Sequence, residues 1–169
     1  GLESNPGFSI SYYLVKRGMF AVVFGDIFMR CVYATRPYEA VAGSTDELHE
    51  KWKKEVIAFI TQKKMLSHGK FKKMCREIIR DFDNLPRKDI KKPRVGVVGE
   101  ILVKFHPAAN NHLVELLESE GAEAVVPDLT DFLLYCFYNT GFKADNLGMS
   151  QKSKKIGRLG INFFEWLRS

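Results

Sequence analysis

The fold class of this chain is decided by the stretch Val95-Gly96-Val97-Val98-Gly99-Glu100. Its β-branched residues run almost without polar interruption, as expected of a strand buried on both faces in a parallel sheet. Pro107 can open the following helix, and Gly121 can close it. A second apolar run, Ala124 to Pro127, then predicts another strand. A strand, a helix and a strand within this length predict a right-handed βαβ unit.

Three helices are predicted before this unit. Apolar residues recur at offsets of three and four between Ser11 and Ala34, which is the helical period. A second helix is expected to begin at a capping box formed by Ser44 and Glu47 and to end at His68-Gly69. A third follows and stops at Asn84. We therefore expect a helix-rich α/β fold, with a helical N-terminal half and a small parallel sheet holding a Rossmann-like or flavodoxin-like βαβ unit in the second half.

Two further helices are expected after the unit, one over residues 128–138 and a last one capped near Ser150 or Ser153. The basic, proline-containing residues 87–94 are interpreted as a linker. The expected division is a helical part, residues 1–92, and a βαβ-containing part, residues 93–169, in one compact domain. Because the chain begins with glycine, we expect a domain cut from a longer protein, and further strands are expected in the N-terminal region, in a partner or in the parent protein.

Composition limits the class of protein. The 169 residues are 46% hydrophobic and 27% charged, the usual balance for a globular domain. The longest uncharged apolar run, Gly18 to Gly25, is far below the roughly 20 residues needed to span a bilayer, so no membrane protein is expected. Three widely spaced cysteines without a C-x-x-C pair favour packing roles and a reducing cytoplasm. No phosphate loop, G-x-G-x-x-G motif, histidine pair of a zinc site or nucleophile elbow is present, and no metal site is predicted.

Positive charge is concentrated in one region. Residues 51–94 hold 15 Lys and Arg against 5 Asp and Glu, within a chain of net charge +6. Clustered cations can bind nucleic acid by releasing counterions from phosphates. The lysine doublets lie on expected helices or in the linker, however, where solvated faces are the commoner outcome. Nucleic-acid binding is therefore retained as an alternative only.

Polar residues occur where the first strand is expected to end. Ligands of open α/β sheets bind beyond the carboxyl ends of the strands, which is where Gly99 and Glu100 fall. Asn110 and Asn111 lie at the start of the next helix, whose unpaired amides favour anions. By spacing alone, Glu100 could instead cap a turn and the asparagines could cap the helix. The functional interpretation predicts one cleft shared by Glu100 and the asparagine pair.

Two blocks of sequence carry a family resemblance. The downstream block consists of Pro93 to Phe105, Pro107, Asn110-Asn111, Leu117-Glu118, Glu120-Gly121-Ala122-Glu123 and Pro127. The upstream block, interpreted as a structural motif, contains Gly25-Asp26, Arg36-Pro37-Tyr38-Glu39, Gly43 and Trp52. Together they resemble the 2-hydroxyacyl-CoA dehydratase-related family, notably long proteins in which a CoA-enzyme activase is fused to a dehydratase-like region.

The resemblance implies a place in anaerobic acyl-CoA metabolism. In that family an activase uses ATP to deliver a low-potential electron to an iron-sulfur dehydratase, a lyase that removes water from a 2-hydroxyacyl-CoA. The family's cluster-binding cysteine pattern and its activase phosphate motifs are not recognisable in this sequence. We therefore expect a scaffold and part of an acyl-CoA pocket, inactive alone, with any [4Fe-4S] cluster and ATP bound elsewhere in the parent protein. The alternative is a non-catalytic module that docks an activase or sister subunit.

The resemblance also implies roles for individual residues. Glu100 would be a hydrogen-bond acceptor or acid/base group, and Gly99 would let the backbone approach a ligand. Asn110-Asn111 would position the ligand or its loop. Arg36 would either form a bracing ion pair with Glu39 or meet an anionic group of CoA. We favour bracing, because an arginine beside a proline turn usually organises backbone and a partner carboxylate.

Overall fold

The computed structural model describes residues 11–147 and 151–168. The chain forms two compact units, one reaching to Val126 and one starting at Pro127. The fold is a helix-rich α/β fold with a small parallel sheet, as predicted. Both strands and the first three helices belong to the first unit, so the division lies after Val126 and not after residue 92.

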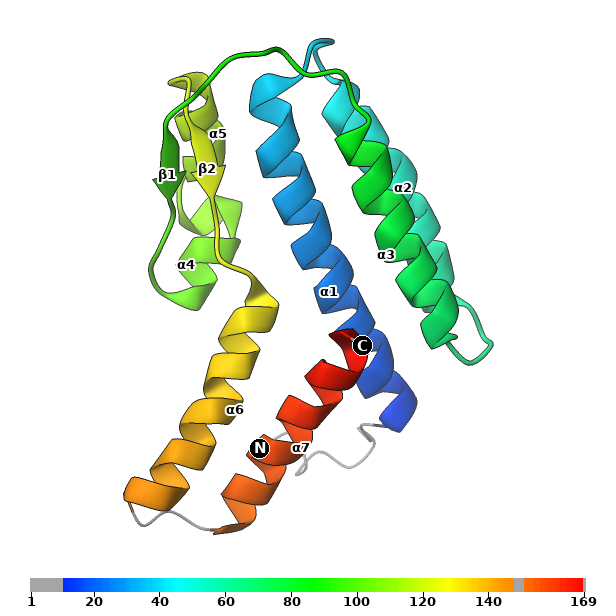
Figure 1. Cartoon of the computed structure of the whole chain (residues 1–169), viewed down its shortest axis with the longest axis vertical. Helices are drawn as coiled ribbons and strands as arrows, with labels where there is room; N and C mark the ends of the chain where they lie inside the picture. The colour runs from blue at the N-terminus through cyan, green and yellow to red at the C-terminus, as the bar shows by residue number, and fades with distance from the viewer. Residues whose placement is uncertain (1–10, 148–150, 169) are drawn as a thin grey trace. The chain divides into compact units, whose positions relative to one another are not determined.

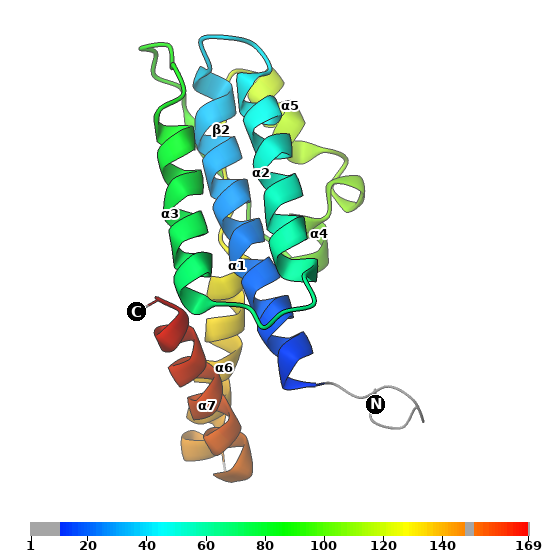
Figure 2. The same cartoon turned by 90° about the vertical axis from the view of Figure 1, so that its right-hand side faces the viewer.

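Three long helices form most of the first unit: α1 (Tyr12–Thr35), α2 (Ser44–Thr61) and α3 (His68–Asp83). The side chain of Ser11 caps α1 by accepting a hydrogen bond from the Leu14 amide at 3.2 Å. Figures 1 and 2 show α1 lying against both α2 and α3, with the sheet on its other side. By length and composition α1 could cross a membrane, a test that the core helix of a globular protein also passes.

The core between these helices is aromatic. Phe71 of α3 stacks on Phe20 of α1 with ring centroids 4.0 Å apart, and meets the edge of Phe24 at 5.0 Å. Phe59 of α2 contacts both α1 rings. All four side chains are at most 3% exposed. The apolar stripes that predicted the helices therefore form the main hydrophobic core of this unit.

The predicted βαβ unit is present. Strands β1 (Arg94–Gly96) and β2 (Glu123–Val125) pair in parallel, with Arg94 opposite Glu123 (Figure 1). The connection differs from the single expected helix: α4 (Ile101–Phe105) and the 3₁₀ turn η3 (Pro107–Ala109) precede α5 (Leu113–Ser119). Pro107 ends the helical path because it has no amide hydrogen to donate and disfavours helical geometry in the residue before it.

The expectation that the first strand is buried on both faces was wrong. All three residues of β1 are exposed, and Val97, just beyond the strand, is the buried residue of this segment. The strand lies at the edge of a two-stranded sheet, whereas β2 contacts α1 and buries Ala124. A satellite core of Val97, Val114, Ala124 and Val126 packs against Met29 and Tyr33 of α1. This packing joins the helical half and the βαβ unit into one body.

The capping box predicted at the start of α2 does not form. The N-cap residue is Gly43, whose φ of 84° suits glycine. Glycine has no side chain that could cap the helix. The carboxylate of Glu39 performs this task instead, accepting hydrogen bonds from the amides of Gly43 at 2.7 Å and Thr45 at 3.1 Å. The helix also ends earlier than predicted, at Thr61, and Ser67 caps the separate helix α3.

We expect Glu39→Gln to destabilise the first unit by about 1 kcal/mol at pH 7, as is typical of a weakened helix cap. Burial raises the pKa of Glu39, but the hydrogen bonds from Gly43 and Thr45, together with the charge of Arg36, outweigh burial and lower the pKa. A lowered pKa stabilises the fold above the unfolded value of 4.5, and this contribution is lost as the pH falls through the folded value. The difference between wild type and Glu39→Gln should therefore shrink below pH 4.5.

Urea unfolding at several pH values measures this difference. Glu47→Gln is the matched control, because the capping box assigned the decisive carboxylate to Glu47. A larger loss of stability for Glu47→Gln than for Glu39→Gln would restore the capping box and contradict the cap described here.

The second unit is a helical hairpin of α6 (Leu129–Asn146) and α7 (Gln151–Arg168). Helix α6 continues past residue 138, where it was expected to end. Within the continued helix, the hydroxyl of Thr140 donates to the Cys136 carbonyl at 2.7 Å. A Cβ at Gly160 would lie 2.7 Å from the Phe137 ring, so glycine permits the close approach of the two helices. The caps predicted at Ser150 or Ser153 lie outside the described residues and side chains.

Candidate functional site

Glu100 follows β1, which ends at Gly96, and is the N-cap of α4. Its Oε2 accepts hydrogen bonds from the amides of Leu102 at 2.8 Å and Val103 at 3.2 Å. Gly99, immediately before it, has a φ of 148°, which L-residues rarely adopt. The carboxylate therefore already satisfies helix amides that a bound anion would need, which is the local capping arrangement considered as the alternative.

Asn110 connects the two short helices of the βαβ connection. Its Nδ2 donates to the Val103 carbonyl at 2.9 Å, and its Oδ1 accepts from the Leu113 amide at 3.2 Å. Asn111 is exposed and has a φ of 54°, in the left-handed region that asparagine tolerates. The pair thus shapes the turn between α4 and α5.

A small cavity of about 30 Å³ lies beside Asn110. Its lining includes Met29 and Tyr33 from α1 and Lys104 and Phe105 from α4. Pockets for small molecules usually measure roughly 300–1,000 Å³, so this cavity is of water size. Neither Glu100 nor Asn111 lines this cavity. A ligand-binding role for these residues stays a prediction.

Arg36 makes a bidentate ion pair with Glu118, which is 82 residues away in the sequence. Its Nε lies 2.7 Å from Oε2 of Glu118, and its Nη2 donates to Oε1 of the same residue at 3.1 Å. Nη1 also lies 3.3 Å from Asp46. Burial lowers the pKa of Arg36, but its bonds to Glu118 and Asp46 outweigh this and raise the pKa. The predicted bracing role is retained, but the predicted partner Glu39 was wrong, because the carboxylate of Glu39 caps α2.

A second contact lies close by in the chain. The hydroxyl of Tyr38 donates to Oε2 of Glu123 at 2.8 Å, while Arg94 Nε lies 3.0 Å from Oε1 of the same carboxylate. The hydrogen bond to Glu123 is the main cause of a raised pKa of Tyr38. We call the residues Arg36, Tyr38, Arg94, Glu118 and Glu123 the polar junction. It ties the turn after α1 to α5 and both strands.

Spacing did not identify the partners in this junction. Glu118 and Glu123 lie 82 and 85 residues beyond the side chains they bind. The available signal was that both acids occur within the downstream resemblance block, while Arg36 and Tyr38 occur within the upstream one. Charged and polar residues in two distant blocks can pair in the folded chain, but one sequence does not specify which acid meets which base.

The cysteines occupy half-buried positions on separate helices. Burial raises the pKa of Cys31 to about 11 and that of Cys75 to about 12, so both thiols are protonated near neutral pH. Cys136 lies on α6 in the second unit. Among the side chains that the structure describes, no three His, Cys, Asp or Glu residues are grouped to hold a metal ion.

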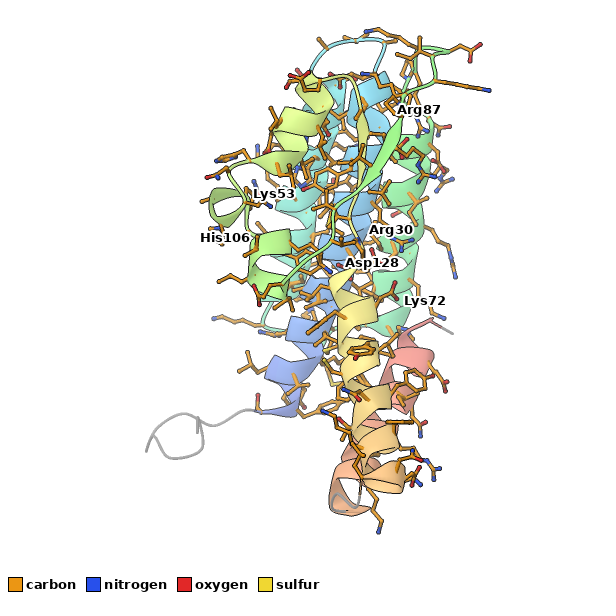
Figure 3. All side chains as sticks on the ribbon, turned by 90° about the vertical axis from the view of Figure 1, so that its left-hand side faces the viewer. Arg30, Lys53, Lys72, Arg87, His106 and Asp128 are labelled. Atoms are coloured by element: carbon orange, nitrogen blue, oxygen red, sulfur yellow. The ribbon has the colours of Figure 1, made fainter. Side chains whose placement is uncertain are left out.

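The basic residues of the 51–94 region spread over more than one face. Figure 3 shows Lys72 and Arg87 on one side of the first unit and Lys53 on the other. Several pair with acids of their own helix, including Lys53 with Glu50 and Lys73 with Glu77. This arrangement favours solvated helix faces over one continuous nucleic-acid surface.

No protein-family model, curated protein or solved structure matches this chain.

Proposed function

We propose that this chain is a scaffold region of a 2-hydroxyacyl-CoA dehydratase-like or activase-associated protein. It contributes part of an acyl-CoA pocket and no complete active site. The observation that carries the proposal is the polar junction, in which Arg36 binds Glu118 and Tyr38 binds Glu123. These contacts join the two sequence blocks that resemble the family.

The distinctive residues of both blocks are used in folding contacts. Glu39 caps α2, Glu100 caps α4, and Asn110 joins α4 to α5. In Glu39 and Glu100 the oxygens that accept these amides are already occupied by the chain's own backbone. Such residues suit a framework that holds neighbouring regions in place. In this proposal the iron-sulfur cluster and the ATP-dependent activase belong to other regions of the parent protein or to sister subunits.

The pocket contribution is assigned to the backbone where the chain leaves β1. Gly99 has no side chain to block a ligand, and the space around its Cα is open. Exposed Glu100 and Asn111 border the same α4–α5 connection. The cytoplasm is the compartment that this oxygen-sensitive chemistry and the reduced cysteines favour.

Anaerobic reconstitution with iron and sulfide tests the scaffold role. We expect the chain alone to gain no stoichiometric cluster absorbance and to leave 2-hydroxyacyl-CoA unchanged, even with reductant, because its three thiols lie on separate helices. A stoichiometric [4Fe-4S] spectrum or measurable dehydration by the chain alone would overturn the scaffold assignment.

Calorimetric titration with CoA and an acyl-CoA tests the pocket contribution separately. Glu100→Gln keeps a side-chain oxygen for the α4 cap but removes the charge, and we expect it to change acyl-CoA affinity by about tenfold if Glu100 meets the ligand. Glu120→Gln, an exposed change at the end of α5, is the matched control. If neither folded wild type nor folded Glu100→Gln releases heat on titration, the chain contributes no acyl-CoA pocket. The scaffold assignment would then be tested by the cluster reconstitution alone.

A docking module is the second candidate, favoured by one surface of α6. Tyr135, Tyr138 and Phe142 follow one another at helical spacing, and each is more than half exposed. Exposed apolar groups of this kind often mark contact surfaces. Sedimentation of the chain with an activase measures complex formation, and Tyr138→Ser should weaken a complex made by this surface.

A further inference from the structure

We propose that the outer edge of β1 is a docking site for an extended segment of a partner protein. The segment adds to the sheet as a parallel strand. It is acidic where it lies beside Lys91 and Arg94, and apolar where it lies beside Val98. The inference is independent of the acyl-CoA proposal, because it uses only the backbone and side chains around β1.

The backbone of β1 has one paired and one unpaired edge. The Pro93 carbonyl accepts from the Glu123 amide at 2.8 Å, and the Val97 amide donates to the Val125 carbonyl at 2.9 Å. Since hydrogen-bonding direction alternates along a strand, Val95 also faces β2, whereas Arg94 and Gly96 direct their N–H and C=O groups to the opposite edge. Among the residues described, no main-chain hydrogen bond outside the β1–β2 pair involves Arg94 or Gly96.

The surroundings of this edge are open. Arg94, Val95 and Gly96 are all exposed, and β1 lies on the outer side of β2 in Figure 1. Val98 is 81% exposed and Leu102 is 63% exposed, although both are apolar. An exposed strand edge of this kind is a template for strand addition, in which main-chain hydrogen bonds supply affinity and flanking side chains supply selectivity.

Charge defines the chemistry of the occupant. Lys88, Lys91, Lys92 and Arg94 precede or begin the strand, against the single acid Asp89. The apolar side chains of Val98 and Leu102 follow it. A segment that presents acidic residues to the first group and apolar residues to the second is therefore complementary along its whole length.

The inner edge of β1 already binds a segment of this kind. Strand β2 runs parallel to β1, begins with Glu123 opposite Arg94, and continues with Ala124 and Val125. The Glu123 carboxylate lies 3.0 Å from the Arg94 guanidinium. An acid-first, apolar-after strand is thus the chemistry with which β1 pairs on its inner side, and it sets the expected direction on its outer side.

The probe is the peptide acetyl-Asp-Glu-Val-Thr-Val-Val-Thr-amide, titrated into the full chain while amide hydrogen exchange is followed by NMR. We expect exchange at Arg94 and Gly96 to slow by about tenfold at saturation, as hydrogen-bonded amides become protected. Val95 and Val97, which already face β2, should change little. A peptide with Lys-Lys in place of Asp-Glu, and one with the reversed sequence, should both bind more weakly.

Two variants separate backbone pairing from simple charge attraction. Gly96→Pro removes the outward amide and should lower the affinity for the acidic peptide by about five- to tenfold. Gly96→Ala keeps the amide and should bind the peptide as wild type does. The space around Gly96 is open, so the alanine fits. Lys91→Glu should lower the affinity for the acidic peptide by about threefold without altering the strand.

Three results would overturn the proposal. Unchanged exchange at Arg94 and Gly96 with saturating peptide would mean that the basic flank merely protects the edge from pairing. Equal or tighter binding of the reversed peptide would refute the parallel direction. Protection of the same two amides in a concentration-dependent dimer without peptide would assign the edge to a second copy of this chain.

Discussion

Replacing Phe71 with alanine is expected to lower the free energy of unfolding of the first unit by about 3–5 kcal/mol, the usual range for a buried phenylalanine. The ring is 2% exposed and stacks on Phe20 with centroids 4.0 Å apart. Its removal takes away the ring contacts to Phe20 and Phe24 of α1 and leaves a cavity that the packed helices cannot readily close. Urea unfolding, followed by the fluorescence of buried Trp52 in a Trp166→Phe background, measures this loss.

Ile57→Ala is the matched control, because Ile57 lies on α2 but is 52% exposed. Its effect should stay within about 0.5–1 kcal/mol, as for most surface positions. Equal effects of Phe71→Ala and Ile57→Ala would mean that the aromatic cluster is not the core of this unit.

The next largest effect is expected for Glu118→Ala, which should destabilise the first unit by about 2 kcal/mol. Hydrogen bonds to charged groups contribute roughly 1.5–3 kcal/mol, and the loss of one partner leaves the other charge poorly compensated. The side chain of Glu118 is 13% exposed and that of Arg36 is 24% exposed, so water replaces the lost bonds only in part. Urea unfolding of Glu118→Ala, Arg36→Ala and the double variant measures both the loss and the coupling.

The double variant should be less destabilised than the sum of the single variants by about 1–2 kcal/mol, because the two side chains interact directly. Glu120→Ala, two residues further along and exposed, is the control and should have little effect. Strict additivity of Glu118→Ala and Arg36→Ala would remove the energetic basis for the polar junction.

The long helices were predictable because their signals are local. The start of α1 near Ser11 and the end of α3 at Asn84 depend on residues within a few positions of each helix end. The parallel pairing of β1 and β2 was also predictable, since a strand, a helical connection and a strand of this length have few alternatives. The burial of β1 was not, because burial depends on how many strands stand beside it.

For the candidate site, the sequence predicted where the residues lie relative to the strand and the helices, but not what their side chains contact. Glu100 does follow the first strand, and Asn110 does begin a turn before a helix. Their orientation could not be inferred, because a short acid or amide near a helix start can face either a ligand or the helix's own amides. In the structure both side chains accept hydrogen bonds from helix amides. This arrangement is lower in free energy when those amides otherwise lack partners.

By itself, the sequence determined the presence of the long helices and the parallel pairing of the two strands, because hydrophobic period and turn residues act over short distances. Only the tertiary structure decided that Arg36 pairs with Glu118 rather than Glu39, that Glu39 caps α2, and that β1 keeps one edge open. These outcomes depend on which surfaces meet after the chain has folded. A charged side chain has several partners within reach at that stage, and it pairs with the one whose geometry and burial are most favourable.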